Sequence, residues 1–206
     1  HRRGCGAAAA RTAGNGAGRL TPSAEPSANG FGNYSRIGHA PGHGEAPAPA
    51  EDQIAGAVAD LDKARRVVII AGGGAANANA GAGILAIAER LNAPVLTSQT
   101  GKGVFPEDHP LSLGNLWSFG NPVDALLKRA DTVLVIGTKL GGSETEDGAM
   151  QLPTTFLRID IDPEEIERNY RPSRSIVADA KKGAEALAAA LERAGVSKPG
   201  FSADEV

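Results

Sequence analysis

The stretch Val67–Gly74, with the sequence VVIIAGGG, decides the fold class of this 206-residue chain. Its first five residues form an unbroken apolar run rich in β-branched side chains, which is typical of a strand buried on both faces of a parallel sheet. Gly72, Gly73 and Gly74 end this predicted strand. A glycine cluster between a strand and a helix is where doubly wound folds bring their backbone close to a phosphate group.

Strands and helices alternate on both sides of this stretch. Apolar runs predict strands over residues 67–71, 94–97, 132–136, 155–159 and 175–178. Amphipathic periods predict helices over 51–64, 77–91, 122–130 and 180–194, with one or two helical turns over 164–169. Alternation at this spacing requires parallel strand pairing with right-handed crossovers. We therefore predict an α/β fold with a doubly wound, mainly parallel (Rossmann-like) sheet and helices on both faces.

The first fifty residues differ from the rest in composition. More than half of them are Gly, Ala or Pro, and Leu20 and Ile37 are the only Leu, Ile or Val residues among them. Such a segment has too little apolar surface to offset the entropy lost on ordering. We therefore predict a low-complexity, disordered leader over residues 1–50, a domain over residues 51–195, and a tail or linker over residues 196–206.

Composition argues against several classes of function. The chain has 21 Lys and Arg residues against 24 Asp and Glu residues, so no basic field favours nucleic acid. Cys5 is its single cysteine, which excludes an intramolecular disulfide and a zinc site built from several cysteines. No apolar run reaches the roughly 18 residues of a membrane span. The arginine-rich start lacks the amphipathic period of an organelle transit peptide, so we predict a cytoplasmic location.

The glycine cluster does not complete either of two common nucleotide-binding motifs. Asn77 stands in place of the third glycine of the dinucleotide fingerprint G-x-G-x-x-G. A P-loop is excluded because Gly103 follows Gly101-Lys102 where Ser or Thr is required. Two interpretations of the cluster are therefore open: a phosphate held against the backbone, or a tight strand-to-helix turn without a ligand.

Other residues with catalytic chemistry are few. Asp160 and Asp162 follow a predicted strand, where they either accept ribose hydroxyls or serve acid–base chemistry, or where Asp162 simply caps the next helical turn. His109 lies in a polar turn and is expected to be a surface or packing residue. No complete catalytic constellation is visible in the chain, so the expected set of catalytic and metal-binding residues is empty.

Six segments carry a family resemblance, and they occur in order within about residues 51–193. They are Val67–Ala75, Ala93–Val95, Gly101–Pro110, Ala130–Gly137, Arg158–Ile166 and Val177–Ala180. Together they resemble the central domain of thiamine-diphosphate-dependent enzymes of the acetolactate synthase and 2-oxo-acid decarboxylase family. Each segment is short, and the ordered set carries the resemblance.

The resemblance implies a larger parent enzyme with three α/β domains in each chain. In that family, thiamine diphosphate and Mg²⁺ are bound by the first and third domains, so this chain alone is expected to be inactive. The parent enzyme would be a lyase or transferase that decarboxylates a small 2-oxo acid and then ligates or releases the product. It would act as a homodimer or homotetramer in which this domain serves as scaffold and dimer support.

In some family members the central domain also binds FAD or ADP. The resemblance places the phosphates of such a nucleotide over Gly72–Gly74, and its adenosine end near Asp160, Ile161 and Asp179. Acetolactate synthases have an Arg-Phe-Asp-Asp-Arg-like segment where this chain has Thr138–Ser143. The lysine of this segment lacks the planar fork with which arginine binds a phosphate pair. We therefore expect a weak or vacant nucleotide site and not a tight FAD site.

Two alternatives to the family interpretation stay open. One is the FAD- or NAD-binding domain of a different flavoprotein or of a sirtuin-like deacylase, both of which share the sheet and the glycine turn. The deacylase is disfavoured because its zinc site needs a set of cysteines, and the flavoprotein because an arginine-rich FAD pattern is missing. The other alternative is a scaffold without catalytic function.

Overall fold

The computed structural model describes residues 45–115, 122–145 and 147–206 of the chain. Most of the predicted leader, residues 1–44, lies outside the described residues. Residues 45–50 are extended and lead into helix α1 (Glu51–Lys63). The N–H group of Asp179 donates a hydrogen bond of 2.9 Å to the carbonyl oxygen of Pro47, which ties this segment to the domain.

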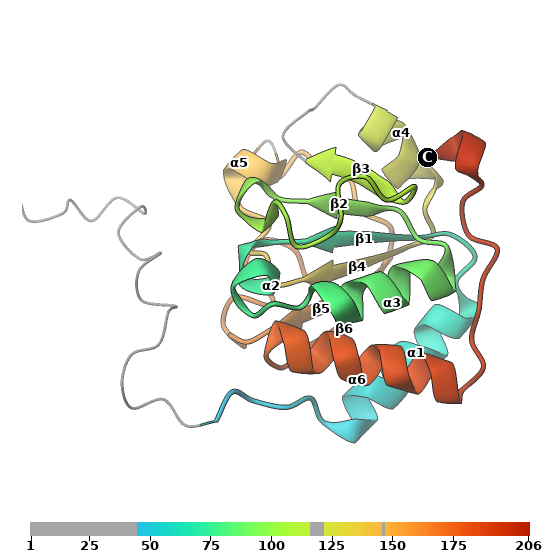
Figure 1. Cartoon of the computed structure of the whole chain (residues 1–206). Helices are drawn as coiled ribbons and strands as arrows, with labels where there is room; N and C mark the ends of the chain where they lie inside the picture. Colours follow the sequence, from blue (N-terminus) through green and yellow to red (C-terminus); the bar gives the residue numbers. More distant parts are fainter. Residues whose placement is uncertain (1–44, 116–121, 146) are drawn as a thin grey trace, which may run out of the picture. The chain divides into compact units, whose positions relative to one another are not determined.

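In the described part of the chain, six strands form one sheet in the order β3-β2-β1-β4-β5-β6 (Figure 1). They are β1 (Val67–Ala71), β2 (Val95–Thr97), β3 (Ser112–Asn115), β4 (Thr132–Ile136), β5 (Thr155–Asp160) and β6 (Arg174–Val177). All five pairings between neighbouring strands are parallel. This arrangement confirms the predicted α/β, Rossmann-like fold class.

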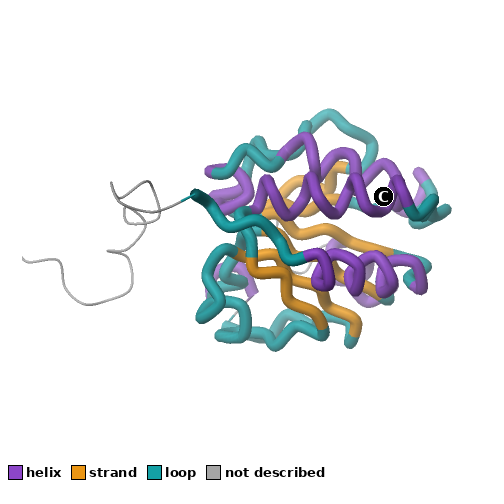
Figure 2. Tube along the Cα trace, turned by 90° about the horizontal axis from the view of Figure 1, so that it is seen from below, coloured by secondary structure: helices purple, strands orange, loops and turns teal. Residues whose placement is uncertain are grey.

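Helices pack on both faces of the sheet (Figure 1, Figure 2), and every residue of the central strands β1 and β4 is buried. The helices after α1 are α2 (Gly73–Asn77), α3 (Gly81–Leu91), α4 (Pro122–Arg129), α5 (Gly142–Thr145) and α6 (Ala180–Arg193). Alternate residues of β1 enter different cores. Ile69 belongs to the core beneath α1, α3 and α6, whereas Ile70 belongs to the core that contains Leu126 and Leu127 of α4.

The structure differs from the sequence predictions at three places. The helix predicted over 77–91 begins only at Gly81, as α3, because α2 ends at Asn77 and the chain turns at Asn79, which adopts a left-handed φ of 56°. Asparagine tolerates this conformation, so the chain can turn there. The sequence pattern does not predict β3, because Ser112–Asn115 contains a single large apolar residue. Residues 164–169 form turns and no helix.

The predicted tail, residues 196–206, runs past the amino-terminal ends of the strands (Figure 1). The ring of Phe201 is fully buried, and the guanidinium carbons of Arg66 and Arg129 lie 5.4 Å and 5.9 Å from its centroid. Glu205 forms ion pairs with the same two arginines, at 3.0 Å from Arg66. The described end of the chain is therefore part of the folded domain.

Candidate functional site at the switch point of the sheet

The residues predicted to contact a nucleotide all follow the carboxyl end of a strand. Gly72–Gly74 follow β1, Asp160 and Ile161 stand at the end of β5, and Asp179 follows β6. The strand order reverses between β1 and β4, because β1 continues to β2 on one side and β4 to β5 on the other. Ligands of doubly wound folds bind at such a topological switch point.

The glycine turn is in close contact with the end of β4. The N–H groups of Gly72 and Gly74 donate hydrogen bonds to the carbonyl oxygens of Ile136 (2.9 Å) and Gly137 (2.8 Å). A Cβ atom on Gly72 would lie 2.3 Å from the Cβ of Thr138, and one on Gly74 would lie 2.9 Å from the Gly137 oxygen. The close approach of two backbone segments therefore accounts for these glycines without a ligand.

The loop after β2 packs against the same turn. Ser98 is fully buried; its Oγ accepts a hydrogen bond of 3.1 Å from the N–H of Gly101 and lies 3.2 Å from Thr100 Oγ1. A Cβ atom on Gly73 would lie 2.6 Å from that Thr100 oxygen. The loops after β1, β2 and β4 therefore form one packed layer above the switch point.

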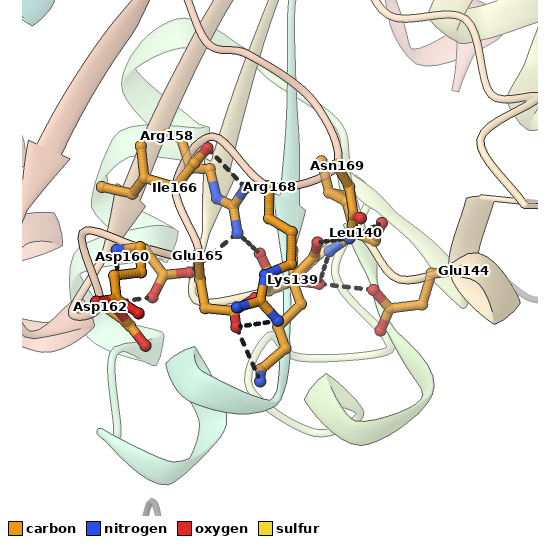
Figure 3. A network of polar contacts seen from close by, with 12 residues as sticks. Lys139, Leu140, Glu144, Arg158, Asp160, Asp162, Glu165, Ile166, Arg168 and Asn169 are labelled. Carbon is orange, nitrogen blue, oxygen red and sulfur yellow. Dashed lines mark hydrogen bonds and ion pairs between the residues drawn. The ribbon is translucent and has the colours of Figure 1, made fainter. Parts of the chain in front are cut away.

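A fully buried arginine joins the ends of β4 and β5 (Figure 3). Arg158 Nη2 donates hydrogen bonds to the carbonyl oxygen of Thr138 (2.9 Å) and to Asp160 Oδ2 (3.3 Å), and its Nη1 donates to the carbonyl oxygen of Ile166 (2.9 Å). Its Nε has no hydrogen-bond partner among the described residues. Arg158 thus connects three segments: the loop after β4, the end of β5, and the turn that follows β5.

The carboxylate of Asp160 is nearly buried, with 8% of the residue exposed. Burial raises the pKa of Asp160 above its ordinary value. The N–H of Asp162, 3.2 Å from Oδ1, and the positive charge of Arg158 act in the opposite direction. Each carboxylate oxygen of Asp160 therefore already accepts a hydrogen bond from the protein.

Lys139, the basic residue of the loop after β4, is engaged within the protein (Figure 3). Its Nζ lies 3.6 Å from Oε1 of the buried Glu165, which Arg168 Nη1 also approaches at 2.9 Å. The other carboxylate oxygen of Glu165, Oε2, is buried without a partner among the described residues. The Nδ2 of Asn169 donates hydrogen bonds to the carbonyl oxygens of Lys139 (2.9 Å) and Leu140 (3.1 Å). Other protein groups therefore bind both the side chain of Lys139 and the backbone carbonyl groups of this loop.

The predicted adenosine-side residues are in different environments. Ile161 is 45% exposed and is the one exposed large apolar side chain among the described residues. Asp179 caps α6, since its Oδ1 accepts hydrogen bonds from the N–H groups of Lys181 (3.0 Å) and Lys182 (3.1 Å). Asp160 and Ile161 border the Arg158 network, whereas Asp179 follows the neighbouring strand at the end of the sheet.

His109 has the packing role that the sequence predicts. Its Nδ1 accepts a hydrogen bond of 3.2 Å from the N–H of Leu111, and its ring meets Phe105 edge-on at 5.1 Å between centroids. Throughout the described ranges, no group of three or more His, Cys, Asp or Glu residues could hold a metal ion. Within the same ranges, no helix is long and apolar enough to cross a membrane.

Sequence reasoning does not single out Arg158 or Glu165 as site residues. The available signal is a charged residue inside the otherwise apolar run of β5. A charge in that position must find partners, because an unpaired buried charge is strongly destabilising. Arg158 finds its partners in the loop after β4 and in the turn after β5. A buried charge in β5 is therefore a sequence signal for contacts near the switch point.

The sequence matches a family model described as the central domain of thiamine pyrophosphate enzymes, over residues 54–187. The chain belongs to this family. It is 38% identical over 141 residues to a probable acetolactate synthase large subunit of Methanocaldococcus jannaschii, covering 68% of this chain and 24% of the relative. It is 34% identical over 151 residues to the probable 2-ketoarginine decarboxylase AruI of Pseudomonas aeruginosa, covering 73% and 26%.

Solved structures support the same assignment: a putative thiamin diphosphate-dependent enzyme of Mycobacterium smegmatis superposes with a TM-score of 0.58 at 25% sequence identity, covering 71% of this chain and 29% of that one. Benzoylformate decarboxylase of Polynucleobacter necessarius superposes with a TM-score of 0.57 at 26% sequence identity, covering 73% of this chain and 29% of that one. The family resemblance that the sequence indicates is thereby confirmed. This central domain spans about a quarter of the length of the two curated relatives.

Proposed function

We propose that this chain is the central domain of a larger thiamine-diphosphate-dependent enzyme that decarboxylates a small 2-oxo acid and then ligates or releases the product. The observation that carries the proposal is the family match over residues 54–187. The matched region is also only about a quarter of the length of a probable acetolactate synthase large subunit and of a probable 2-ketoarginine decarboxylase. The family domain would extend over residues 51–195, and the folded unit would also include residues 196–206, which pack on it through Phe201. The cytoplasmic location also stays a prediction.

Within that enzyme, the domain would act as a scaffold and support a homodimer or homotetramer. Its described residues do not fit the Mg²⁺ ion that would accompany thiamine diphosphate, because none of their acidic and histidine side chains form a metal-binding group. Thiamine diphosphate and Mg²⁺ would therefore be held by other domains. The contribution of this chain would be mechanical: two cores that hold a rigid parallel sheet.

We also propose that a nucleotide site at the switch point, with contacts from Gly72–Gly74, Asp160, Ile161 and Asp179, is weak or vacant for FAD and ADP. Two contacts support this. The N–H groups of Gly72 and Gly74 already donate hydrogen bonds to carbonyl oxygens of β4 and of the loop that follows it. The Lys139 ammonium is paired with Glu165 of the same chain. A phosphate group would have to replace these internal contacts.

Calorimetry tests the assignment to a central domain. The isolated chain, titrated with thiamine diphosphate and Mg²⁺, is expected to release no heat of binding. The longer protein encoded by the same gene is expected to bind both and to release CO₂ from a 2-oxo acid such as pyruvate. Binding of thiamine diphosphate by the isolated chain at micromolar affinity would contradict the proposal, as would failure of the longer protein to bind it.

A further inference from the structure

We propose that Arg158 and Asn169 lock the loop after β4, residues 138–141, over the glycine turn, and that this lock keeps a pyrophosphate group out of the switch point. The inference rests on the proposed weak or vacant nucleotide site and assigns its weakness to particular residues. Arg158 and Asn169 are positioning residues, since they act through the loop.

A pyrophosphate can reach the N–H groups of Gly72 and Gly74 only by displacing the chain at the end of β4. The N–H groups of Gly72 and Gly74 point to the carbonyl oxygens of Ile136 and Gly137, at 2.9 Å and 2.8 Å. Thr138 comes next in the chain and lies directly against Gly72. Access to these donors therefore requires the backbone around Gly137 and Thr138 to move.

Thr138 is held in place by hydrogen bonds to its carbonyl oxygen and to its hydroxyl group. Its carbonyl oxygen accepts the 2.9 Å hydrogen bond from the buried Arg158. Its hydroxyl donates a hydrogen bond of 2.7 Å to Glu144 Oε2 and accepts one of 3.1 Å from the N–H of Leu140. Leu140 itself is fully buried with a left-handed φ of 47°. A leucine keeps such a conformation only where its surroundings enforce it.

Asn169 holds the next part of the loop from the surface. One amide nitrogen donates to the carbonyl oxygens of both Lys139 and Leu140, at 2.9 Å and 3.1 Å. The residue is exposed, so shortening its side chain leaves no cavity in the core. The lock can therefore be loosened at Asn169 without removing the buried arginine.

The test compares the 206-residue wild-type chain with Asn169→Ala and with a surface control, Arg171→Ala, whose side chain is 83% exposed. In Asn169→Ala, the amide of Leu140 is expected to exchange with solvent about tenfold faster, since two hydrogen bonds to the loop are lost. ADP, followed by NMR titration, is expected to bind about tenfold more tightly, because apparent affinity rises with the fraction of open loop. Arg171→Ala should change neither quantity.

Each outcome decides a different point. Unchanged exchange of the Leu140 amide, or unchanged ADP affinity, in Asn169→Ala overturns the lock. Tight binding of ADP by the wild-type chain would instead overturn the proposed weak site, while leaving the family assignment intact. Arg158→Lys provides a second variant that keeps the charge: it is expected to loosen the Thr138 contact and accelerate the same amide.

Discussion

The Nη2 group of Arg158 donates a hydrogen bond of 2.9 Å to the carbonyl oxygen of Thr138, although the two residues are 20 positions apart in the chain. Arg158 is paired with Val135 in the ladder between β4 and β5, and its side chain reaches Thr138 in the loop after β4. Withdrawing a guanidinium from water costs several kcal/mol, so this group is tolerated only because protein acceptors surround it. The ends of the two strands are thus tied together by a charged side chain.

Replacing this side chain is expected to destabilise the domain. Arg158→Met keeps an apolar stem but leaves Asp160 as a buried carboxylate without its cation, and leaves two carbonyl oxygens without their donor. We expect the free energy of unfolding in urea to fall by about 3–5 kcal/mol, the range for breaking a buried ion pair.

Arg171→Ala is the matched control for that experiment. Its side chain is 83% exposed and pairs with Glu167, whose side chain is 60% exposed. Exposed ion pairs contribute about 0–1 kcal/mol, so the control should lose less than about 1 kcal/mol. Equal losses in the two variants would show that burial of Arg158 has no special energetic role.

Strands that are unbroken apolar runs can be predicted from the sequence alone. The runs at 67–71 and 132–136 have the same bounds as β1 and β4. The sequence was insufficient for β3, whose residues Ser112–Asn115 are held as a strand by pairing with β2 and not by their own pattern. It also missed the break at Asn79, because an alanine-rich segment continues the helical pattern on both sides of it.

The site was harder to predict than the fold, because its contacts join distant parts of the chain. The positions of Gly72–Gly74 and Asp160 at strand ends follow from local pattern alone. That Thr138 packs on Gly72, and that Arg158 reaches Thr138, depends on the pairing of β4 with both β1 and β5. The local sequence pattern contains no signal for such pairings.

A buried glycine of α3, Gly83, is expected to be required for packing against α6. A Cβ atom on Gly83 would lie 2.9 Å from both backbone and side-chain atoms of Ala184, and 2.9 Å from the nitrogen of Glu185. Gly83→Ala should therefore lower the free energy of unfolding by about 1–3 kcal/mol, as is usual for an overpacked core. Thermal and urea unfolding measure the change.

Gly141→Ala is the control for Gly83→Ala. A Cβ atom at Gly141 would meet nothing within 4 Å, so we expect a change within about 0.5 kcal/mol. If Gly83→Ala were as stable as this control, the helices would have room to separate, and the close packing of α3 on α6 would not be a constraint on the fold.

The end of the chain is expected to contribute to stability. Phe201→Ala removes a fully buried ring that contacts Arg66 and Arg129, so the free energy of unfolding in urea should fall by about 3 kcal/mol or more. Phe201→Leu keeps most of the apolar contact and should lose clearly less. A Phe201→Ala chain with wild-type stability would mean that residues 196–206 are a tail that contributes nothing to the domain.

The buried carboxylate of Asp160 is expected to make stability depend on pH. Burial raises the pKa of Asp160 above its ordinary value of 3.8, so the folded chain binds this proton more tightly than the unfolded chain. The resulting stabilisation is fully present below the ordinary pKa and is lost as the pH rises through the higher, folded-state pKa. Above its folded-state pKa, Asp160 is an ionised carboxylate whose burial is unfavourable.

Asp160→Asn isolates this effect, because asparagine has the shape of the acid and does not ionise. The free energy of unfolding of the wild type minus that of Asp160→Asn should rise as the pH falls from neutrality to about 4, since only the wild type gains a proton at this site. Urea unfolding at several pH values measures the difference, with Asp108→Asn, an exposed position, as the surface control. A difference that falls with falling pH would mean that Arg158 and the N–H of Asp162 outweigh burial and that the pKa of Asp160 is lowered.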